Sequence, residues 1–464
     1  MKKASLALAV AAGTLGLTLV NVANAAFIED SKAKLDLRNF YFDNDNRESQ
    51  GDVGVGAAHS GQVREWGQAF QLNLQSGFTE GTIGVGVDAI GLLGVRLDGG
   101  GYSRTPAKAG QSRTPSALFP LESDGSARDE FSSLGLTGKI RFSKTVAHIG
   151  TLQPKLPVVT FNDGRLIPQT FEGAQITSNE IDNLTLVAGQ LEHAKGRTSS
   201  DADSLSIARN SGLNDIPVAD SNKFYYGGAD YKINKDLLVQ YYYGNLDDFY
   251  KQHFLGLTHT LALGAGSLKS DLRYFDTSSD GKNGSAAGRA DGYIGSGYWN
   301  GGRGNSDFGE VDNRTWSAMF TYSLEGHALS AGYQQVSGDS NFTQLNQGSL
   351  PGQGGATTYL ITDRQITNFG RAGERTWITQ YGYDFGKIGV PGLTANVLYM
   401  KGDNIKSADG DLKEWERDLT VSYVLQEGAM KGLGFAWRNA SLRSEAAADT
   451  DQNRLIVSYS IPLM

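Results

Sequence analysis

The sequence predicts an all-β fold, a transmembrane antiparallel β-barrel of about 18 strands with short periplasmic turns and long extracellular loops. Three observations support this class. Apolar and polar residues alternate along many segments, the spacers between those segments are short and long in turn, and no apolar run beyond the amino terminus is long enough for a spanning helix. The 464 residues are therefore compatible with one large closed sheet.

The amino terminus has the pattern of an export signal. Two lysines precede an apolar run over residues 4–20, and the small-residue pattern Ala23-Asn24-Ala25 follows. We expect residues 1–25 to be cleaved and residues 26–464 to form a single barrel domain. A membrane anchor is the alternative, but glycines interrupt a run that is already short for a spanning helix.

Alternation with a period of two residues predicts the strands. Along residues 316–324, Trp, Ala, Phe, Tyr and Leu occupy one face and mostly hydroxyl side chains the other, and residues 453–463 repeat the pattern. Soluble sandwiches also show such alternation, so the number and spacing of the segments decide between the classes. The predicted strands are 33–43, 63–78, 82–90, 134–143, 146–153, 174–181, 184–193, 224–232, 236–245, 252–264, 268–276, 314–324, 327–338, 374–385, 393–402, 414–425, 433–443 and 453–463. The long spacers are about 91–133, 194–223, 277–312 and 339–372.

The membrane requires such a sheet to close. In hydrocarbon each unpaired backbone group costs several kcal/mol, so only helices and closed barrels can span it. The predicted apolar faces carry no charged residue, and a cation there would cost about 2–4 kcal/mol at the bilayer midplane. A barrel of about 16–18 strands leaves an aqueous lumen. Aromatic residues stand toward strand ends, where interfacial girdles form, at Trp66, Phe78, Trp316, Trp377, Phe385, Trp437 and Tyr459.

The sequence contains the runs Arg64-Glu65-Trp66-Gly67-Gln68, Pro154-Lys155-Leu156-Pro157-Val158, residues 162–173, and Gly389-Val390-Pro391-Gly392-Leu393. These runs resemble the OprD family of pseudomonad porins. The resemblance extends across the mature chain. It implies an 18-stranded, substrate-selective channel for passive uptake of small water-soluble nutrients, many of which bear a carboxylate. It also implies that the segment from about 154 to 173 folds inward as a constriction loop.

Basic residues opposite the apolar stripe are candidates for the lumen wall. By this rule the inward-facing set is Arg38, Lys139, Arg141, Lys269, Arg273 and Arg438. A row of arginines can pass a carboxylate from one bidentate contact to the next, and charged rings make pores selective. The alternative is an ordinary polar wall, with the arginines paired to acids such as Asp36 or Asp271.

The resemblance adds four pore-lining candidates: Arg165 in the inward loop, Lys401 and Arg417 near later strand ends, and Asp312. Arg417 has the parity of Leu419, which alternation directs toward lipid, so it lines the pore only from a rim or a bulge.

Two departures from the family pattern affect the basic row. Relatives often carry arginine at the positions that are Leu398 and Ala436 in this chain. These departures place a full basic track in doubt and suggest an altered substrate preference.

Composition excludes several other functions. The formal charge of −8 and the 42 basic against 50 acidic residues give no basic excess for nucleic acid, and the absence of cysteine excludes thiolate chemistry. The six histidines form no metal-binding pair, and no catalytic motif is present. We therefore expect no enzyme activity, no metal and no cofactor. The expected partners are outer-membrane lipid, small solutes, periplasmic chaperones and the assembly machinery, with monomer and homotrimer both open.

Three further hypotheses remain. A barrel with a closed lumen and long loops could act in adhesion or surface binding, and a spatial Ser–His–Asp site would make it a serine peptidase. A secreted soluble β-protein would be extractable without detergent. The location we predict is the bacterial outer membrane.

Overall fold

The structure is a computed structural model that describes residues 24–47, 62–99, 117–122, 126–208, 213, 215–300, 302–348 and 355–464. Nearly all of the predicted signal peptide, residues 1–25, lies outside these ranges; the described part begins in helix α1 (Asn24–Glu29). No helix within the described ranges is both long enough and apolar enough to cross a membrane.

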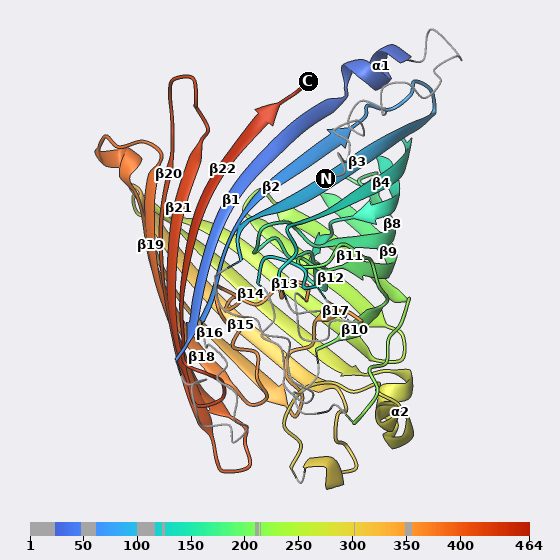
Figure 1. Ribbon diagram of the computed structural model, residues 1–464, viewed down its shortest axis with the longest axis vertical. Helices are drawn as coiled ribbons and strands as arrows, with labels where there is room; N and C mark the ends of the chain where they lie inside the picture. The colour runs from blue at the N-terminus through green and yellow to red at the C-terminus, as the bar shows by residue number, and fades with distance from the viewer. Residues whose placement is uncertain are drawn as a thin grey trace.

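Eighteen antiparallel strands form one closed sheet (Figure 1). They are β1 (Lys32–Asn46), β2 (Gln62–Gln75), β3 (Ile83–Asp98), β4 (Glu130–Phe142), β5 (Thr145–Leu152), β8 (Thr170–Ser178), β9 (Leu184–Lys195), β11 (Phe224–Asn234), β12 (Leu237–Leu246), β13 (Tyr250–Leu263), β14 (Gly266–Ser279), β15 (Asp312–Leu324), β16 (His327–Gly338), β18 (Arg375–Asp384), β19 (Leu393–Ile405), β20 (Leu412–Val424), β21 (Gly434–Ser444) and β22 (Thr450–Pro462). Each strand pairs with its neighbours in chain order, and β22 pairs with β1 to complete the cylinder.

The remaining elements are short and belong to the loops. They are the two-stranded pairs β6 (Lys155–Leu156) with β7 (Val159–Thr160) and β10 (Leu205–Ile207) with β17 (Leu345–Gln347), the helix α2 (Ala286–Ala290), and the 3₁₀ turns η2 (Gly281–Gly284), η3 (Gly302–Gly304) and η4 (Phe385–Ile388). The short turns and the carboxyl end lie at the top of Figure 1, and α2 and most of the loop structure lie at the opposite rim.

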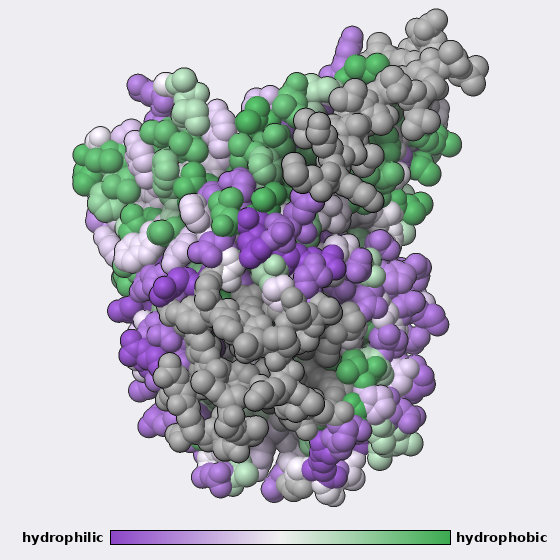
Figure 2. Space-filling model, in the orientation of Figure 1, coloured by the Kyte–Doolittle hydropathy of each residue, from purple (hydrophilic) through white to green (hydrophobic). Residues whose placement is uncertain are grey.

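The outward face of the sheet is apolar in the half nearer the short turns. On β4, Leu134 and Leu136 are 67% and 58% exposed, and they alternate with the buried Thr137 and Lys139. Figure 2 shows hydrophobic residues gathered in the upper part of the barrel and mostly hydrophilic residues below them. This exposed apolar belt is the surface that lipid covers.

Aromatic side chains lie outward as predicted at several positions, and Phe78 is an exception. Trp66, Trp316, Trp377 and Trp437 are all exposed on the outer face. The Phe78 ring instead lies 4.9 Å from Lys139 Nζ, a side chain that points into the barrel, so this aromatic residue belongs to the lumen.

The inside of the barrel is filled on one side by apolar packing. Inward-facing aromatic residues of β11 to β14 pack against loop residues in the largest buried cluster, which includes Phe224, Tyr242, Phe254, Phe275, Phe342 and Leu360. Burying each such ring stabilises the fold by about 1.5–3 kcal/mol. A second buried cluster lies against β1–β3, and the cavity that remains lies beside β1, β2 and β22.

Candidate functional site

The segment between β5 and β8 narrows the lumen. Leu166 and Ile167 near its tip are buried, and they pack on the inward-facing rings of Phe40, Phe42 and Phe119. Gly67 makes this approach feasible, because a Cβ atom there would lie 2.7 Å from Leu166 Cδ2. Of the expected constriction loop 154–173, residues 154–169 therefore lie inside the barrel, and the last four residues belong to strand β8 in the wall.

Two other loops also turn inward, and buried glutamates hold them there. Glu65 of β2 accepts hydrogen bonds from the backbone N–H groups of residues 117 and 118, at 3.0 and 2.8 Å. Glu416 of β20 accepts three, at 3.2, 2.9 and 3.0 Å, from residues 365–367. Both side chains are almost fully buried. A carboxylate that receives several N–H donors fixes the loop position strongly.

Sequence analysis missed these two loops, although a signal was present. Glu414, Glu416 and Asp418 alternate with the outward-facing residues of β20, so three acids face inward in succession. Buried carboxylates require donors. An inward loop that presents its backbone N–H groups is one source of such donors.

Three arginines form a row along the wall beside the inward loop. Arg454 of β22 stands directly opposite Arg438 of β21, and Arg38 of β1 stands opposite Ser458, further along β22 toward the short-turn rim. Cross-strand neighbours of this kind are roughly 4.5–5.5 Å apart at Cβ. Arg165 reaches the same region from the loop, where its guanidinium lies 4.7 Å from the centre of the Phe42 ring.

Arg38 and Arg454 are engaged with the inward loops. Arg38 forms a bidentate ion pair with Asp163, at 2.7 and 3.0 Å, and donates to the Arg165 carbonyl at 2.8 Å. Arg454 donates to the carbonyl of Gln365 at 2.6 Å. These two guanidinium groups therefore hold the inward loops in position and also give the constriction positive charge.

Arg438 differs from both. In the described part of the chain it has neither a hydrogen-bond partner nor an ion-pair partner, and it is exposed to the lumen. Its donors face a region where Arg38 and Arg454 already supply positive charge. A guanidinium group offers five N–H donors in a planar arrangement that matches a carboxylate. This position is therefore the best-placed anion contact of the row.

A cavity of about 790 Å³ continues from the constriction toward the short-turn rim. Its lining is mostly polar and combines both charges, with Lys34, Asp36, Arg38, Asn73, Asp163 and Ser460 among the residues. Asp36 is itself bound to Lys34 at 2.8 Å and to Asn73 at 2.9 Å. The cavity provides an exit with a largely polar lining on the β1 side of the barrel.

The other basic candidates of the sequence analysis occupy different inward positions. Lys139 is buried between Asp88 and the Ser76 carbonyl, both at 2.6 Å. Arg141 covers the Phe78 ring, with 4.4 Å from its Cζ atom to the ring centre. These two residues lie near the short-turn rim, beyond the constriction.

Lys269 and Arg273 lie on β14, across the barrel from the arginine row. Arg273 is paired with Asp271 at 2.8 and 2.7 Å and packs on Tyr359, which matches the alternative of an ordinary paired wall. Lys269 is exposed and has no ion pair among the described residues.

Three candidates face away from the lumen. Lys401 stands opposite Trp377 and has the parity of Val397 and Tyr399, which are exposed on the outer surface. Arg417 donates to Asn439 and Ser441 on the outer face, as its parity with Leu419 predicted. These two assignments to the pore wall were wrong because family likeness was given precedence over strand parity.

Asp312 is the third outward-facing candidate. It begins β15 with the parity of the exposed Trp316, and its carboxylate pairs with Arg314 at 3.4 Å. It therefore lies at the outer edge of the extracellular rim. Its assignment to the substrate path was also wrong.

Sequence analysis also omitted inward arginines, among them Arg454, Arg197 and Arg364. Arg454 alternates with Leu455, so parity alone identifies it. Arg197 follows β9, and burial lowers its pKa to about 10, so it stays cationic at neutral pH. No pattern in its surrounding loop predicts that this side chain turns inward.

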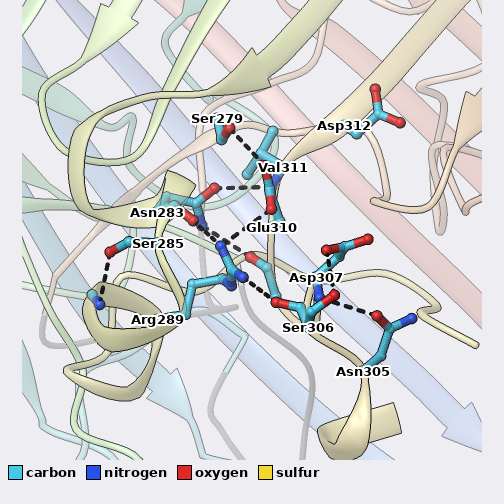
Figure 3. Close-up of polar contacts among 12 residues, drawn as sticks. Ser279, Asn283, Ser285, Arg289, Asn305, Ser306, Asp307, Glu310, Val311 and Asp312 are labelled. Atoms are coloured by element: carbon cyan, nitrogen blue, oxygen red, sulfur yellow. Dashed lines mark hydrogen bonds and ion pairs between the residues drawn. The ribbon is translucent and has the colours of Figure 1, made fainter. Parts of the chain in front are cut away.

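The extracellular mouth is formed in part by a compact loop between β14 and β15 (Figure 3). Asn283 accepts from Val311 N–H at 2.9 Å and donates to Gly309. Arg289 is buried, donates to the Asn283 and Ser306 carbonyls, and pairs with Glu310 at 3.2 Å. One arginine thus ties both ends of the loop together.

We expect Arg289→Leu to loosen this loop and leave the barrel intact. The substitution leaves the Asn283 and Ser306 carbonyls without this donor, and each unsatisfied buried group costs about 1–3 kcal/mol. Limited proteolysis should then cut between residues 280 and 311 faster than in the unmodified protein. The control is Arg303→Leu, which removes an exposed pair with Asp215. Equal cleavage of both variants would contradict the assignment.

The Arg38–Asp163 pair suggests a second test. Asp163→Asn removes the negative charge that neutralises Arg38, so the constriction becomes more positive and anion selectivity measured from reversal potentials should rise. The matched control is Asp182→Asn in a short turn, where the carboxylate is 92% exposed. An unchanged reversal potential in the Asp163 variant would show that the pair lies off the conducting path.

A closed cylinder with an apolar outer belt, inward-folded loops and a hydrated basic path defines a porin of the bacterial outer membrane. The chain belongs to the OprD family. The family model, described as outer membrane porin, OprD family, matches residues 25–463. Members of this family are outer-membrane porins and act as substrate-specific channels. The protein therefore lies in the outer membrane of Gram-negative bacteria, in contact with lipid and small solutes.

Three related proteins illustrate the similarity. Porin-like protein GalP of Pseudomonas putida is 33% identical over 441 residues, which cover 94% of this chain and 93% of GalP. The crystal structure of OccK8 (OprE) of Pseudomonas aeruginosa has a TM-score of 0.83 at 58% identity, covering 95% of this chain and all of that one. OpdK of the same species, crystallised with vanillate, has a TM-score of 0.77 at 34% identity, covering 94% of this chain and 100% of that chain.

Proposed function

We propose that this porin takes up small carboxylate-bearing solutes, guided by Arg454, Arg438, Arg38 and Arg165. The observation that carries the proposal is Arg438, an exposed lumen guanidinium that has no hydrogen-bond or ion-pair partner among the described residues. It stands beside Arg454, which with Arg38 holds the inward loops. Charge-assisted bidentate contacts to a carboxylate are roughly twice as strong as neutral hydrogen bonds.

The position of the cavity supports the same proposal. The cavity lies beside β1, β2 and β22 and is lined by Arg38, and Arg454 belongs to the same wall. The relative OpdK was crystallised with vanillate, an aromatic carboxylate, which is consistent with such a substrate class. Glu65 and Glu416 are committed to loop N–H groups and Asp163 to Arg38, which leaves Asp418 as the inward acid near the cluster of Arg438, Arg454 and Arg38.

Liposome swelling with matched solutes tests this function. Benzoate and benzamide have nearly the same size, and only the first carries a charge. We expect faster swelling with benzoate by severalfold, because the arginine row lowers the barrier for an anion. Equal rates for the two solutes would reject carboxylate selectivity. A folded protein that conducts nothing would favour the alternative of a closed barrel that acts in surface binding.

A further inference from the structure

We propose that the outer surface of β18–β20 binds the phosphate group of an outer-leaflet lipid. The side chains that would form this site, here called the basic patch, are Arg375, Lys401 and Arg417. They belong to three adjacent strands, and all have outward parity near the extracellular rim.

The sheet register brings the patch together. Arg375 stands opposite Asp403, two residues beyond Lys401 on β19, and Arg417 stands opposite Tyr399, two residues before Lys401. Lys401 is thus a diagonal neighbour of Arg375 on one side and of Arg417 on the other, a spacing of roughly 7–8 Å that long side chains can bridge. One phosphate group can contact more than one of them.

The patch is distinguished by the absence of acid partners. In the described part of the chain Arg375 and Lys401 form no ion pair, and Arg417 donates only to the neutral side chains of Asn439 and Ser441, at 3.0 and 3.2 Å. Asp403 is the one acid among these positions, so three positive charges minus one negative charge leave a net charge of +2.

Several other cations at the same rim have an acidic partner within ion-pair distance: Arg47 with Asp451, Arg64 with Asp43, Arg314 with Asp276, Lys413 with Glu445, and Arg443 with Asp449. Lys251 on β13 has no ion pair among the described residues, but it is a single cation whose cross-strand neighbours are Asn245 and Ser278. Against this background the patch offers unpaired positive charge toward the membrane. A negatively charged group outside the protein would complement this positive charge.

An apolar groove beside the patch fits the acyl part of the same lipid. It has a volume of about 570 Å³, and its lining includes the apolar or aromatic residues Trp316, Ala318, Phe320, Tyr333 and Trp377 and, toward the extracellular rim, Arg375 and Asp403. Small side chains form its floor and aromatic rings its walls, with Tyr333 4.7 Å from Trp377 between ring centres. Arg375 lies nearest the extracellular rim of these residues, where a headgroup would be.

The aromatic residues around the cations match an interfacial position. Trp377 and Trp415 lie on either side of Lys401 in the register, and Tyr399 stacks on Trp415 at 5.9 Å. Indole and phenol rings favour the headgroup level of a bilayer. Figure 2 shows the left edge of the barrel, over β19–β21, changing from hydrophobic above to hydrophilic below. Lipid phosphates would therefore lie at the depth of the patch.

Native mass spectrometry of the full-length detergent-purified protein tests the proposal, with bis-phosphorylated lipid A and its dephosphorylated form as probes. We expect the combined variant Arg375→Ala, Lys401→Ala and Arg417→Ala to retain at least tenfold less of the phosphorylated lipid. The matched control removes three lysines from the short-turn rim, by Lys144→Ala, Lys235→Ala and Lys431→Ala. Correct folding of each variant is checked by heat-modifiable migration in a gel.

Three results would overturn the proposal. The first is equal lipid retention by the patch variant and the control, and the second is equal binding of the dephosphorylated probe. The third is a change in oligomeric state that does not depend on lipid, because a second copy of the chain would then cover this surface. Reduced retention confined to the patch variant and the phosphorylated probe supports the site.

Discussion

Arg438→Glu should reduce the permeability of a carboxylate relative to its neutral amide by tenfold or more. The substitution removes the one guanidinium of the row that has no protein partner among the described residues, and it places a negative charge opposite Arg454. Hydrogen bonds to charged groups contribute about 1.5–3 kcal/mol, which corresponds to about tenfold to a hundredfold in an equilibrium constant. Single-channel recording with substrate block, together with reversal potentials, measures the effect.

The control for this experiment changes the same charge outside the pore. Lys251→Glu lies on β13, where residue 251 has the outward parity of the exposed Leu255. It should leave reversal potentials and substrate block unchanged. If both variants behaved alike, net charge rather than a contact at Arg438 would set selectivity, and the proposed role of Arg438 would be wrong.

Glu416→Ala should widen the channel and weaken its selectivity. The three N–H groups of residues 365–367 lose their common acceptor, and an unsatisfied buried donor costs about 1–3 kcal/mol. The loop can recover hydrogen bonds with water by leaving the wall. We therefore expect single-channel conductance to rise severalfold and the preference for benzoate over benzamide to fall.

The matched control is Glu427→Ala, in the exposed short turn between β20 and β21. It removes the same charge without touching an inward loop, and it should keep the original conductance. A Glu416 variant with unchanged conductance would mean that other contacts, such as Arg454 with the Gln365 carbonyl, hold the loop without the carboxylate.

Strand positions were predictable because residues that face lipid are apolar and alternate with the residues that face the lumen. All eighteen predicted segments overlap observed strands, and residues 327–338 agree at both ends. The clearest difference is β3, which continues to Asp98 whereas the prediction ended it at residue 90. Its second half contains Gly91, Gly94 and a run of apolar residues that lacks alternation, since Leu92 is buried inside the barrel.

The lumen was less predictable than the wall. Alternation placed Arg38 and Arg438 on the inward face, and it would also have placed Arg454 there. It cannot show which loop meets which wall, because contacts such as Glu416 with residues 365–367 join segments about fifty residues apart in the chain. The inward aromatic rings of β11–β14 also break the assumption that a lumen wall is polar.

The pairing of β1 with β22 has a consequence for biogenesis. The Gln452 amide donates to Asn44 at 2.7 Å across 408 residues, and Ser460 donates to Asp36 across 424. Partners so distant in the chain meet late and slowly. Both edges of the unfinished sheet therefore keep unpaired backbone N–H and C=O groups while the rest of the wall assembles. A nascent molecule must therefore be shielded from its neighbours until its two extremities are joined.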